Sequence, residues 1–295
     1  MRDPNLFIIG AAKCGTTSMY NWLRNHPDVF MSPVKEPLYY CTDFEWRNVK
    51  DKEVYDSLFK GANYKHKAVG EASASYYLSD VAIPKIEEKY DEPKYIYMVR
   101  EQKKIALSLH KELLKTGNEH IDDFEKAWRL SEERRKGKFI GSYCRNKKWL
   151  DYKNASLVGE RLKWVLQKVP KKRVKVVFLE DIKKEALEEY KKVLNFVGAN
   201  YDGRDEFPVS NKRAKNKYRI VQKAVRTLGD FSRKIKDNVG INRKLGTGIL
   251  NYIQRMNKSD MSREGISSEL ESEMTDYYEE DKRLLHSLTN KTAKI

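Results

Sequence analysis

The chain contains a short loop whose residue types could bind a phosphate-like anion. An apolar run, Leu6–Ile9, leads directly into Gly-Ala-Ala-Lys-Cys-Gly-Thr-Thr at residues 10–17. Glycines let backbone N–H groups face an anion, and the N-terminus of a following helix adds a favourable dipole. In a nucleoside triphosphate loop of the GxxxxGK[ST] type, the lysine follows the second glycine. Here Thr16 has that position and the lysine is Lys13, so its ammonium would contact a different part of a ligand.

Two further residues could bind a phosphate at the other end of a nucleotide. Arg100 closes an apolar run, and Ser108 lies two turns into a helix expected to begin near residues 103 or 104. A guanidinium at a strand end and a helical hydroxyl can converge on one phosphate, for which Arg supplies a fork of donors. The alternative is an arginine paired with an acid such as Glu101, and a surface serine.

Two glutamates could take part in proton transfer. Glu36 lies in a Lys-Glu-Pro sequence that two tyrosines follow closely, and a carboxylate that removes a hydroxyl proton makes a weak nucleophile competent. The alternative for Glu36 is a surface ion pair with Lys35 before a proline turn. Glu71 closes another apolar run and could be a second acid or base, or a hydrogen-bonded structural carboxylate.

These blocks together resemble the sulfotransferases that use 3′-phosphoadenosine 5′-phosphosulfate (PAPS), in particular carbohydrate and heparan-type members and their bacterial relatives. The resemblance covers roughly residues 5–219, with a weaker echo from Tyr277-Tyr278 to Leu288. It implies that Glu36 is the general base, that Lys13 contacts the phosphosulfate, and that the products include adenosine 3′,5′-bisphosphate (PAP), with no metal required. The donor contacts that it implies are Ala12, Lys13, Cys14, Gly15, Thr16, Thr17, Arg100 and Ser108. Cys14 is either a somewhat activated thiol beside Lys13 or a small filler residue.

A strongly basic segment follows the matched blocks. Residues 211–245 contain twelve Lys or Arg and two Asp, a net charge of +10 out of +16 for the chain. Its start occupies the place where the family carries a basic loop over the adenosine 3′-phosphate, which makes Arg213, Lys215 and Lys217 further donor contacts by resemblance. A solvated helix face, or a site for an acidic acceptor, nucleic acid or a membrane surface, is the alternative for these charges.

The acceptor side departs from heparan-type relatives. Some of them have a histidine where this chain has Leu38, and many have a lysine and a proline at the positions of Ala72 and Ala74. We expect an acceptor with a free hydroxyl, best matched by a glycan or glycolipid, although a lipid or another small alcohol stays open. Four aromatic residues could stack on sugar faces or belong to the core: Tyr39, Tyr40, Tyr76 and Tyr77.

The elements that must position these residues follow from apolar periodicity. Four runs indicate buried strands, at residues 6–9, 68–70, 95–99 and 174–179, and helical patterns alternate with them. This order predicts an α/β fold, a single three-layer domain with a central parallel sheet and helices on both faces. Ligands of such sheets bind at the carboxyl ends of the strands. We expect one domain over residues 1–295, with a basic, mainly helical part from 220 onward.

The composition and motifs limit the classes of protein to which this chain could belong. No apolar run approaches the roughly 20 residues that span a bilayer, and residues 6–12 are too short for a signal peptide. Three scattered cysteines form neither a disulfide framework nor a zinc spacing, which favours the cytoplasm and no metal. A P-loop nucleotide kinase would need a lysine at position 16 and magnesium ligands. A nucleic-acid-binding protein would fit the charge, but no helix-turn-helix, zinc or RNA-binding signature is visible.

Overall fold

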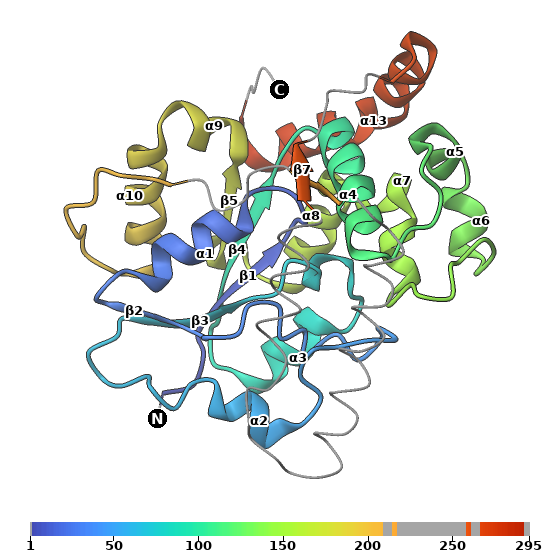
Figure 1. The fold of residues 1–295 in the computed structure, drawn as a ribbon. Helices are drawn as coiled ribbons and strands as arrows, with labels where there is room; N and C mark the ends of the chain where they lie inside the picture. The colour runs from blue at the N-terminus through green and yellow to red at the C-terminus, as the bar shows by residue number, and fades with distance from the viewer. Residues whose placement is uncertain (1, 209–213, 217–257, 261–265, 292–295) are drawn as a thin grey trace.

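A five-stranded parallel sheet forms the centre of the protein, in the order β2-β3-β1-β4-β5 (Figure 1). The structure, a computed structural model, describes residues 2–208, 214–216, 258–260 and 266–291. The strands of the sheet are β1 (Leu6–Gly10), β2 (Val29–Met31), β3 (Ala68–Ala72), β4 (Lys94–Val99) and β5 (Val174–Phe178). Every residue of β1 and β3 is buried, as expected for parallel strands covered on both faces.

Helices cover both faces of this sheet, which confirms the predicted fold class. On one face α1 packs on α10, where Trp22 meets Tyr190 with 6.3 Å between ring centroids, and on the other α3 contacts α8. The helices are α1 (Thr16–Arg24), α2 (Lys52–Ser57), α3 (Ala82–Lys89), α4 (Gln102–Thr116), α5 (Phe124–Arg129), α6 (Ser131–Arg135), α7 (Tyr152–Ala155), α8 (Val158–Lys168), α9 (Leu179–Lys184), α10 (Ala186–Val197) and α13 (Ser268–Thr289). Single 3₁₀ turns are η1 (Tyr76–Leu78), η2 (Lys147–Leu150) and η3 (Lys171–Arg173), and β6 (Ala214–Asn216) pairs with β7 (Lys258–Asp260) in an antiparallel ladder.

Local sequence explains where several helices end. Gly198 has φ 83° and caps α10, because a left-handed residue at that position costs glycine little. Ser268 and Glu271 have the spacing of a capping box, but Ser268 is not the cap of α13. The cap is Ser267, whose Oγ accepts a 3.1 Å hydrogen bond from the amide of Leu270. Both serines suit an N-cap, so the residue types alone do not choose between them.

Strand β2 was missed by the sequence analysis, and it matters for the site. Its three residues are too few to show a periodicity of their own. Pairing with β3 defines it, with Val29 opposite Ala68 and Met31 opposite Gly70. The chain leaves β2 at the same edge of the sheet as β1, β3 and β4, so the segment that contains Glu36 also begins at that edge.

A fully buried ion pair fixes the helices between β4 and β5. The guanidinium of Arg134 on α6 donates to both carboxylate oxygens of Glu119, at 2.6 and 2.9 Å. The hydroxyl of Tyr152 on α7 donates to Glu119 at 2.7 Å, and the amide of Ile121 donates to it at 2.9 Å. The carboxylate is therefore satisfied from several elements at once, which holds the end of α4 against α6 and α7.

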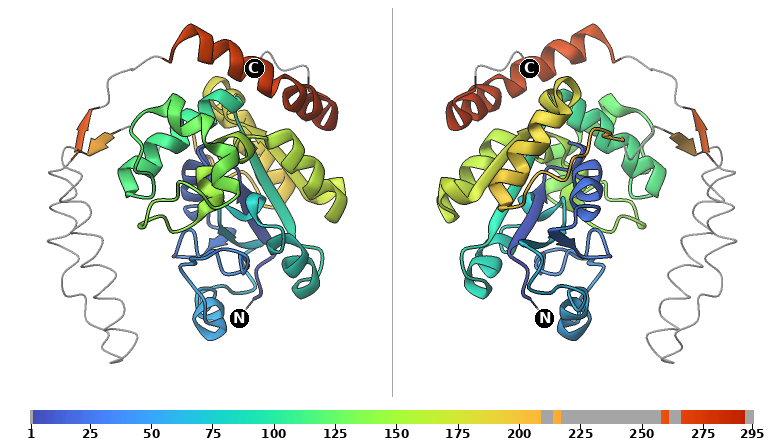
Figure 2. Two further views of the ribbon diagram at one scale, coloured as in Figure 1. Left: turned by 90° about the vertical axis from the view of Figure 1, so that its right-hand side faces the viewer. Right: turned by 90° about the vertical axis from the view of Figure 1, so that its left-hand side faces the viewer.

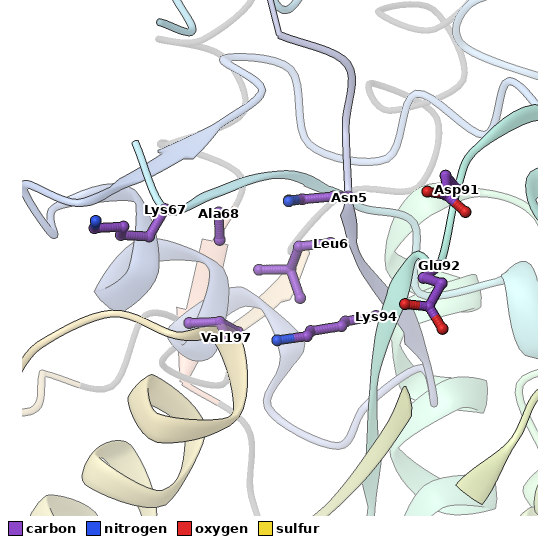
Figure 3. Close-up of a pocket in the computed structure, with 8 residues that line it drawn as sticks. All are labelled: Asn5, Leu6, Lys67, Ala68, Asp91, Glu92, Lys94 and Val197. Atoms are coloured by element: carbon purple, nitrogen blue, oxygen red, sulfur yellow. The ribbon is translucent and has the colours of Figure 1, made fainter. Parts of the chain in front are cut away.

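A small cavity of about 120 Å³ lies at the amino ends of the strands (Figure 3). Asn5 and Lys94 line it from the starts of β1 and β4, together with Lys67, Asp91 and Glu92. Ligands of parallel sheets bind at the opposite, carboxyl edge. The cavity therefore does not belong to the loop at residues 10–17. No helix in the described ranges is long and apolar enough to cross a membrane.

Candidate active site

The loop between β1 and α1 has the backbone geometry of an anion cradle. Gly10 has φ 147° and Gly15 has φ 88°, conformations that other residues rarely adopt. A methyl group on Gly10 would lie 2.6 Å from the ring of Tyr77, and one on Gly15 would lie 2.8 Å from Leu179. Helix α1 has no acidic residue in its first turn and no side-chain cap, so its first N–H groups are available to a bound anion.

Lys13 supplies a cation to this loop. It has φ 66°, and its Nζ lies 3.5 Å from a carboxylate oxygen of Glu112 on α4. Glu112 was missed by the sequence analysis. The available signal was its spacing, since it follows Ser108 by four residues and therefore shares a helix face with it. The contact places this face of α4, with Ser108 half-buried on it, toward the loop.

The other residues of the loop differ in how far they are buried. Cys14 and Thr16 are buried, whereas Ala12, Gly15 and Thr17 are partly exposed. Burial raises the pKa of the Cys14 thiol well above its ordinary range, and the nearby Glu180 raises it further. The thiol is therefore neutral and packs in the core, which supports the filler interpretation of Cys14.

Arg100 reaches the same loop from the end of β4. Its side chain is buried, and its Nη1 donates to the backbone carbonyl of Lys13 at 3.4 Å. The acid beside it in the sequence, Glu101, pairs with Lys104. The structure thus brings the loop and the strand-end guanidinium together and places Ser108 on the helix that follows.

Glu36 lies beside the loop because the segment that follows β2 is hydrogen-bonded to the end of β3 and to the residues just after it. The amide of Glu36 donates to the carbonyl of Ala72 at 2.8 Å, and its side chain accepts a hydrogen bond of 2.8 Å from the amide of Ala74. Glu36 and Leu38, on either side of Pro37, have φ 59° and 55°. Lys35 pairs with the carboxylate, which is still 32% exposed. The ion pair considered as the alternative for Glu36 therefore exists, but the carboxylate is also held in place.

The backbone of Ala74 lies between the Glu36 carboxylate and the loop. Its N–H donates to Glu36, and its carbonyl oxygen would lie 3.1 Å from a methyl group placed on Gly10. A single residue, Ala74, therefore lies between Glu36 and the first residue of the loop. In the sequence, Ala74 is visible only as a departure from relatives, because a backbone contact leaves no signal in the residue type.

Glu71 is a structural carboxylate. It is fully buried, and three hydroxyl groups donate to it: Ser73 at 2.7 Å, Tyr76, and Tyr55 at 3.4 Å. Ser73 Oγ also accepts a 3.0 Å hydrogen bond from the amide of Leu38. Glu71 therefore supports the segment that carries Glu36, and its burial favours the structural alternative.

The stability of the protein is expected to depend on pH through Glu71. Burial raises the pKa of Glu71 from 4.5 to about 7, so ionising it costs more in the folded than in the unfolded protein. The free energy of unfolding should therefore fall as pH rises from about 4.5 to about 7. In Glu71→Gln this fall should be absent. Urea denaturation of both proteins at pH 5 and pH 8 checks it, and the same pH dependence in both would contradict the assignment.

The tyrosines considered for sugar stacking lie mostly in the core. Tyr40, Tyr76 and Tyr77 are buried, and Tyr39 stacks on Tyr55 with 4.3 Å between ring centroids. Their spacing in the sequence does not distinguish these two environments. The core alternative holds for the three buried residues.

The basic residues assigned to the 3′-phosphate lie mostly beyond what the structure describes. Arg213 and Lys217 are outside the described residues. Lys215 is in β6 opposite Ser259, and its side chain is outside the description as well. Their proposed contacts stay predictions. Within the described ranges, no group of three His, Cys, Asp or Glu side chains is arranged to hold a metal ion.

The family follows from comparison with known proteins. A family model described as "Sulfotransferase domain" matches residues 3–219. The chain belongs to the sulfotransferase family. The match begins just before β1 and includes the loop, Glu36, Arg100 and Ser108, so every block on which the sequence resemblance was based lies within it.

Solved sulfotransferases share the fold. A sulfotransferase from Alicyclobacillus acidocaldarius superimposes with a TM-score of 0.63 and 22% identity, over 82% of this chain and 98% of that one. Mouse sulfotransferase SULT7A1, complexed with PAP, gives a TM-score of 0.51 with 15% identity over 98% of this chain and 88% of its own. At these identities the similarity shows the fold alone.

A short segment matches curated carbohydrate sulfotransferases. Carbohydrate sulfotransferase 15 of Homo sapiens is 56% identical over 34 residues, which are 12% of this chain and 6% of the human protein. The Rattus norvegicus protein gives the same values. Because the match spans so little of these relatives, it does not transfer their activity to this chain.

Proposed function

We propose that this sulfotransferase moves a sulfuryl group from PAPS to an acceptor hydroxyl, with Glu36 as the general base. One observation carries the proposal: the Glu36 carboxylate is held 2.8 Å from the amide nitrogen of Ala74, the residue whose carbonyl oxygen lies against Gly10 of the anion-binding loop. A base at that position can remove a proton from a hydroxyl that approaches a group bound in the loop. The second oxygen of Glu36 pairs with Lys35, so the carboxylate has a defined orientation.

The residues of the loop fit a phosphosulfate. Uncapped N–H groups at the start of α1, the absence of acid from its first turn, and the Lys13 ammonium all favour a multiply charged anion. When bound, PAPS supplies the sulfuryl group and a phosphate leaving group. Lys13 exchanges its 3.5 Å contact with Glu112 for the anion.

Each side chain then has one task in an in-line displacement. Glu36 takes the proton of the acceptor hydroxyl while the oxygen–sulfur bond forms and the bond from sulfur to the phosphate oxygen breaks. Lys13 and the loop amides stabilise the charge that develops on that phosphate oxygen; the loss of one such donor typically costs about 10²- to 10³-fold in rate. Thr16 or Thr17 adds a hydroxyl donor. PAP, with its 5′-phosphate, is the leaving product.

Arg100 is assigned to the 3′-phosphate of the donor, together with Ser108. Arg100→Ala should weaken PAP binding about 10- to 100-fold, the equivalent of roughly 1.5–3 kcal/mol for hydrogen bonds to a charged group. Binding of adenosine 5′-monophosphate, which lacks the 3′-phosphate, should hardly change. Calorimetric titration of both ligands checks this, with Arg24→Ala, an exposed arginine at the far end of α1, as the control. An equal loss for both ligands would remove Arg100 from this role.

A carbohydrate is the acceptor that the site favours. The indole Nε1 of the half-buried Trp149 donates to Ser75 Oγ at 3.1 Å, and Ser75 directly follows Ala74. An aromatic ring beside the residue that follows Ala74 suits a sugar ring, and the short match to carbohydrate sulfotransferases agrees. The cytoplasmic location expected from the cysteine content stays part of this proposal.

Transfer of label identifies the acceptor. The protein is incubated with ³⁵S-labelled PAPS and, separately, with fractionated glycan and lipid extracts. Label in a glycan or glycolipid fraction is the expected result. Label only in lipids without sugar would contradict the carbohydrate assignment, and no transfer to any fraction would contradict the proposed reaction.

A further inference from the structure

A buried hydrogen bond joins the last described helix to the beginning of α4. Gln102 Nε2 donates to Asp281 Oδ2 of α13 at 2.7 Å, and both side chains are buried. Gln102 is the first residue of α4 and follows Arg100 by only two positions. The contact therefore fixes the backbone immediately after the strand-end arginine.

Asp281 also holds the beginning of α8. Its carboxylate accepts from the amide of Gly159 at 3.1 Å and from the amide of Glu160 at 2.8 Å. The two helices approach closely at this point, because a methyl group on Gly159 would lie 2.3 Å from the backbone oxygen of Asp281. One buried carboxylate thus links the N-termini of α4 and α8 to α13.

Helix α13 runs across the top of the protein, where the strands of the sheet end (Figures 1 and 2). It contacts both α4 and α8, and at the exposed side Lys103 donates to Thr275 Oγ1 at 3.1 Å. The match to the sulfotransferase domain ends at residue 219, so α13 lies outside it. A segment beyond the matched domain therefore supports the element that carries Arg100 and Ser108.

We infer that Asp281 is a positioning residue for the donor site, acting through Gln102 to fix Arg100 and Ser108 for the 3′-phosphate. This rests on the proposed function of those two residues. The Asp281 contact holds the first turn of α4, from which both residues take their orientation. If that turn shifts, the Arg100 guanidinium and the Ser108 hydroxyl can no longer bind the same phosphate together. The 5′ end of the donor is bound by the loop and is not affected.

The test is the preference of the protein for PAP over adenosine 5′-monophosphate. In Gln102→Leu, Asp281 keeps its two amide donors while the link to α4 is lost. The affinity for PAP should fall about tenfold with little change for the monophosphate. In an Arg100→Ala, Ser108→Ala background the same change should have no further effect on the preference. Thr275→Ala, which removes one of the exposed contacts that Lys103 makes between the same helices, should leave the preference unchanged.

The outcomes separate this inference from the proposed function. If the wild-type protein does not prefer PAP, the assignment of Arg100 and Ser108 fails. If the wild-type protein prefers PAP and Gln102→Leu keeps the full preference, or loses affinity for both ligands equally, Asp281 has no positioning role. Should Gln102→Leu not fold, Gln102→Asn, which is one methylene too short to reach Asp281, is measured in the same way with the same criteria.

Discussion

Replacing Glu36 with Gln should lower kcat by about 10²- to 10⁴-fold, the usual contribution of a general base. Gln keeps the size of the side chain and can still accept the hydrogen bond from Ala74, which measures 2.8 Å with Glu36. It cannot take up a proton from the acceptor. PAP affinity should therefore be nearly unchanged, because the donor is bound by the loop and by Arg100.

Steady-state kinetics and calorimetric titration with PAP check this prediction on the same preparation. Glu45→Gln is the matched control, since Glu45 is an exposed acid of the neighbouring segment that pairs with Lys147 at 3.7 Å. It should leave both quantities close to wild type. If Glu36→Gln retained most of its kcat, or lost PAP binding in proportion to kcat, Glu36 would not be the base.

Arg134→Met should destabilise the protein by about 3–5 kcal/mol, the usual cost of removing one partner of a buried ion pair. Arg134 and Glu119 are both fully buried. The variant leaves the Glu119 carboxylate with the hydroxyl of Tyr152 and backbone amides as donors but without a countercharge. Guanidinium denaturation of the wild type and the variant measures the loss.

A second substitution shows that the loss comes from the unpaired charge. Arg134→Met combined with Glu119→Leu removes both charges, and a buried pair replaced by apolar groups often costs little. The double variant should therefore recover a large part of the stability lost in Arg134→Met. A single variant within about 1 kcal/mol of the wild type would mean that the pair behaves like an exposed one.

The chemistry of the site could be read from the sequence where it depends on residue types. Residue order directly shows the glycines of the loop and the arginine at the end of a strand, Arg100. It also shows that Lys13 is not at the lysine position of a nucleoside triphosphate loop. Ala74 could not be found in this way, and for Glu112 the available signal was its spacing from Ser108. The first acts through its backbone, and the second meets Lys13 only because α4 folds back over the loop.

The fold shows the same division. Short apolar runs rich in β-forming residues predicted four strands of the sheet, whereas β2 is defined by its pairing with β3. Leu179, expected at the end of a strand, begins α9 instead. The buried network of Glu119, Arg134 and Tyr152 has no local signature, because its members lie up to 33 residues apart in the chain.

Thermal unfolding with two ligands tests the central claim, that the loop binds PAPS rather than a nucleoside triphosphate. A ligand at about 100 times its dissociation constant stabilises a protein by roughly 2.7 kcal/mol. We expect PAP to stabilise the protein by this order and ATP with magnesium to have little effect. Stabilisation by ATP with magnesium but not by PAP would contradict the account and favour a nucleotide kinase.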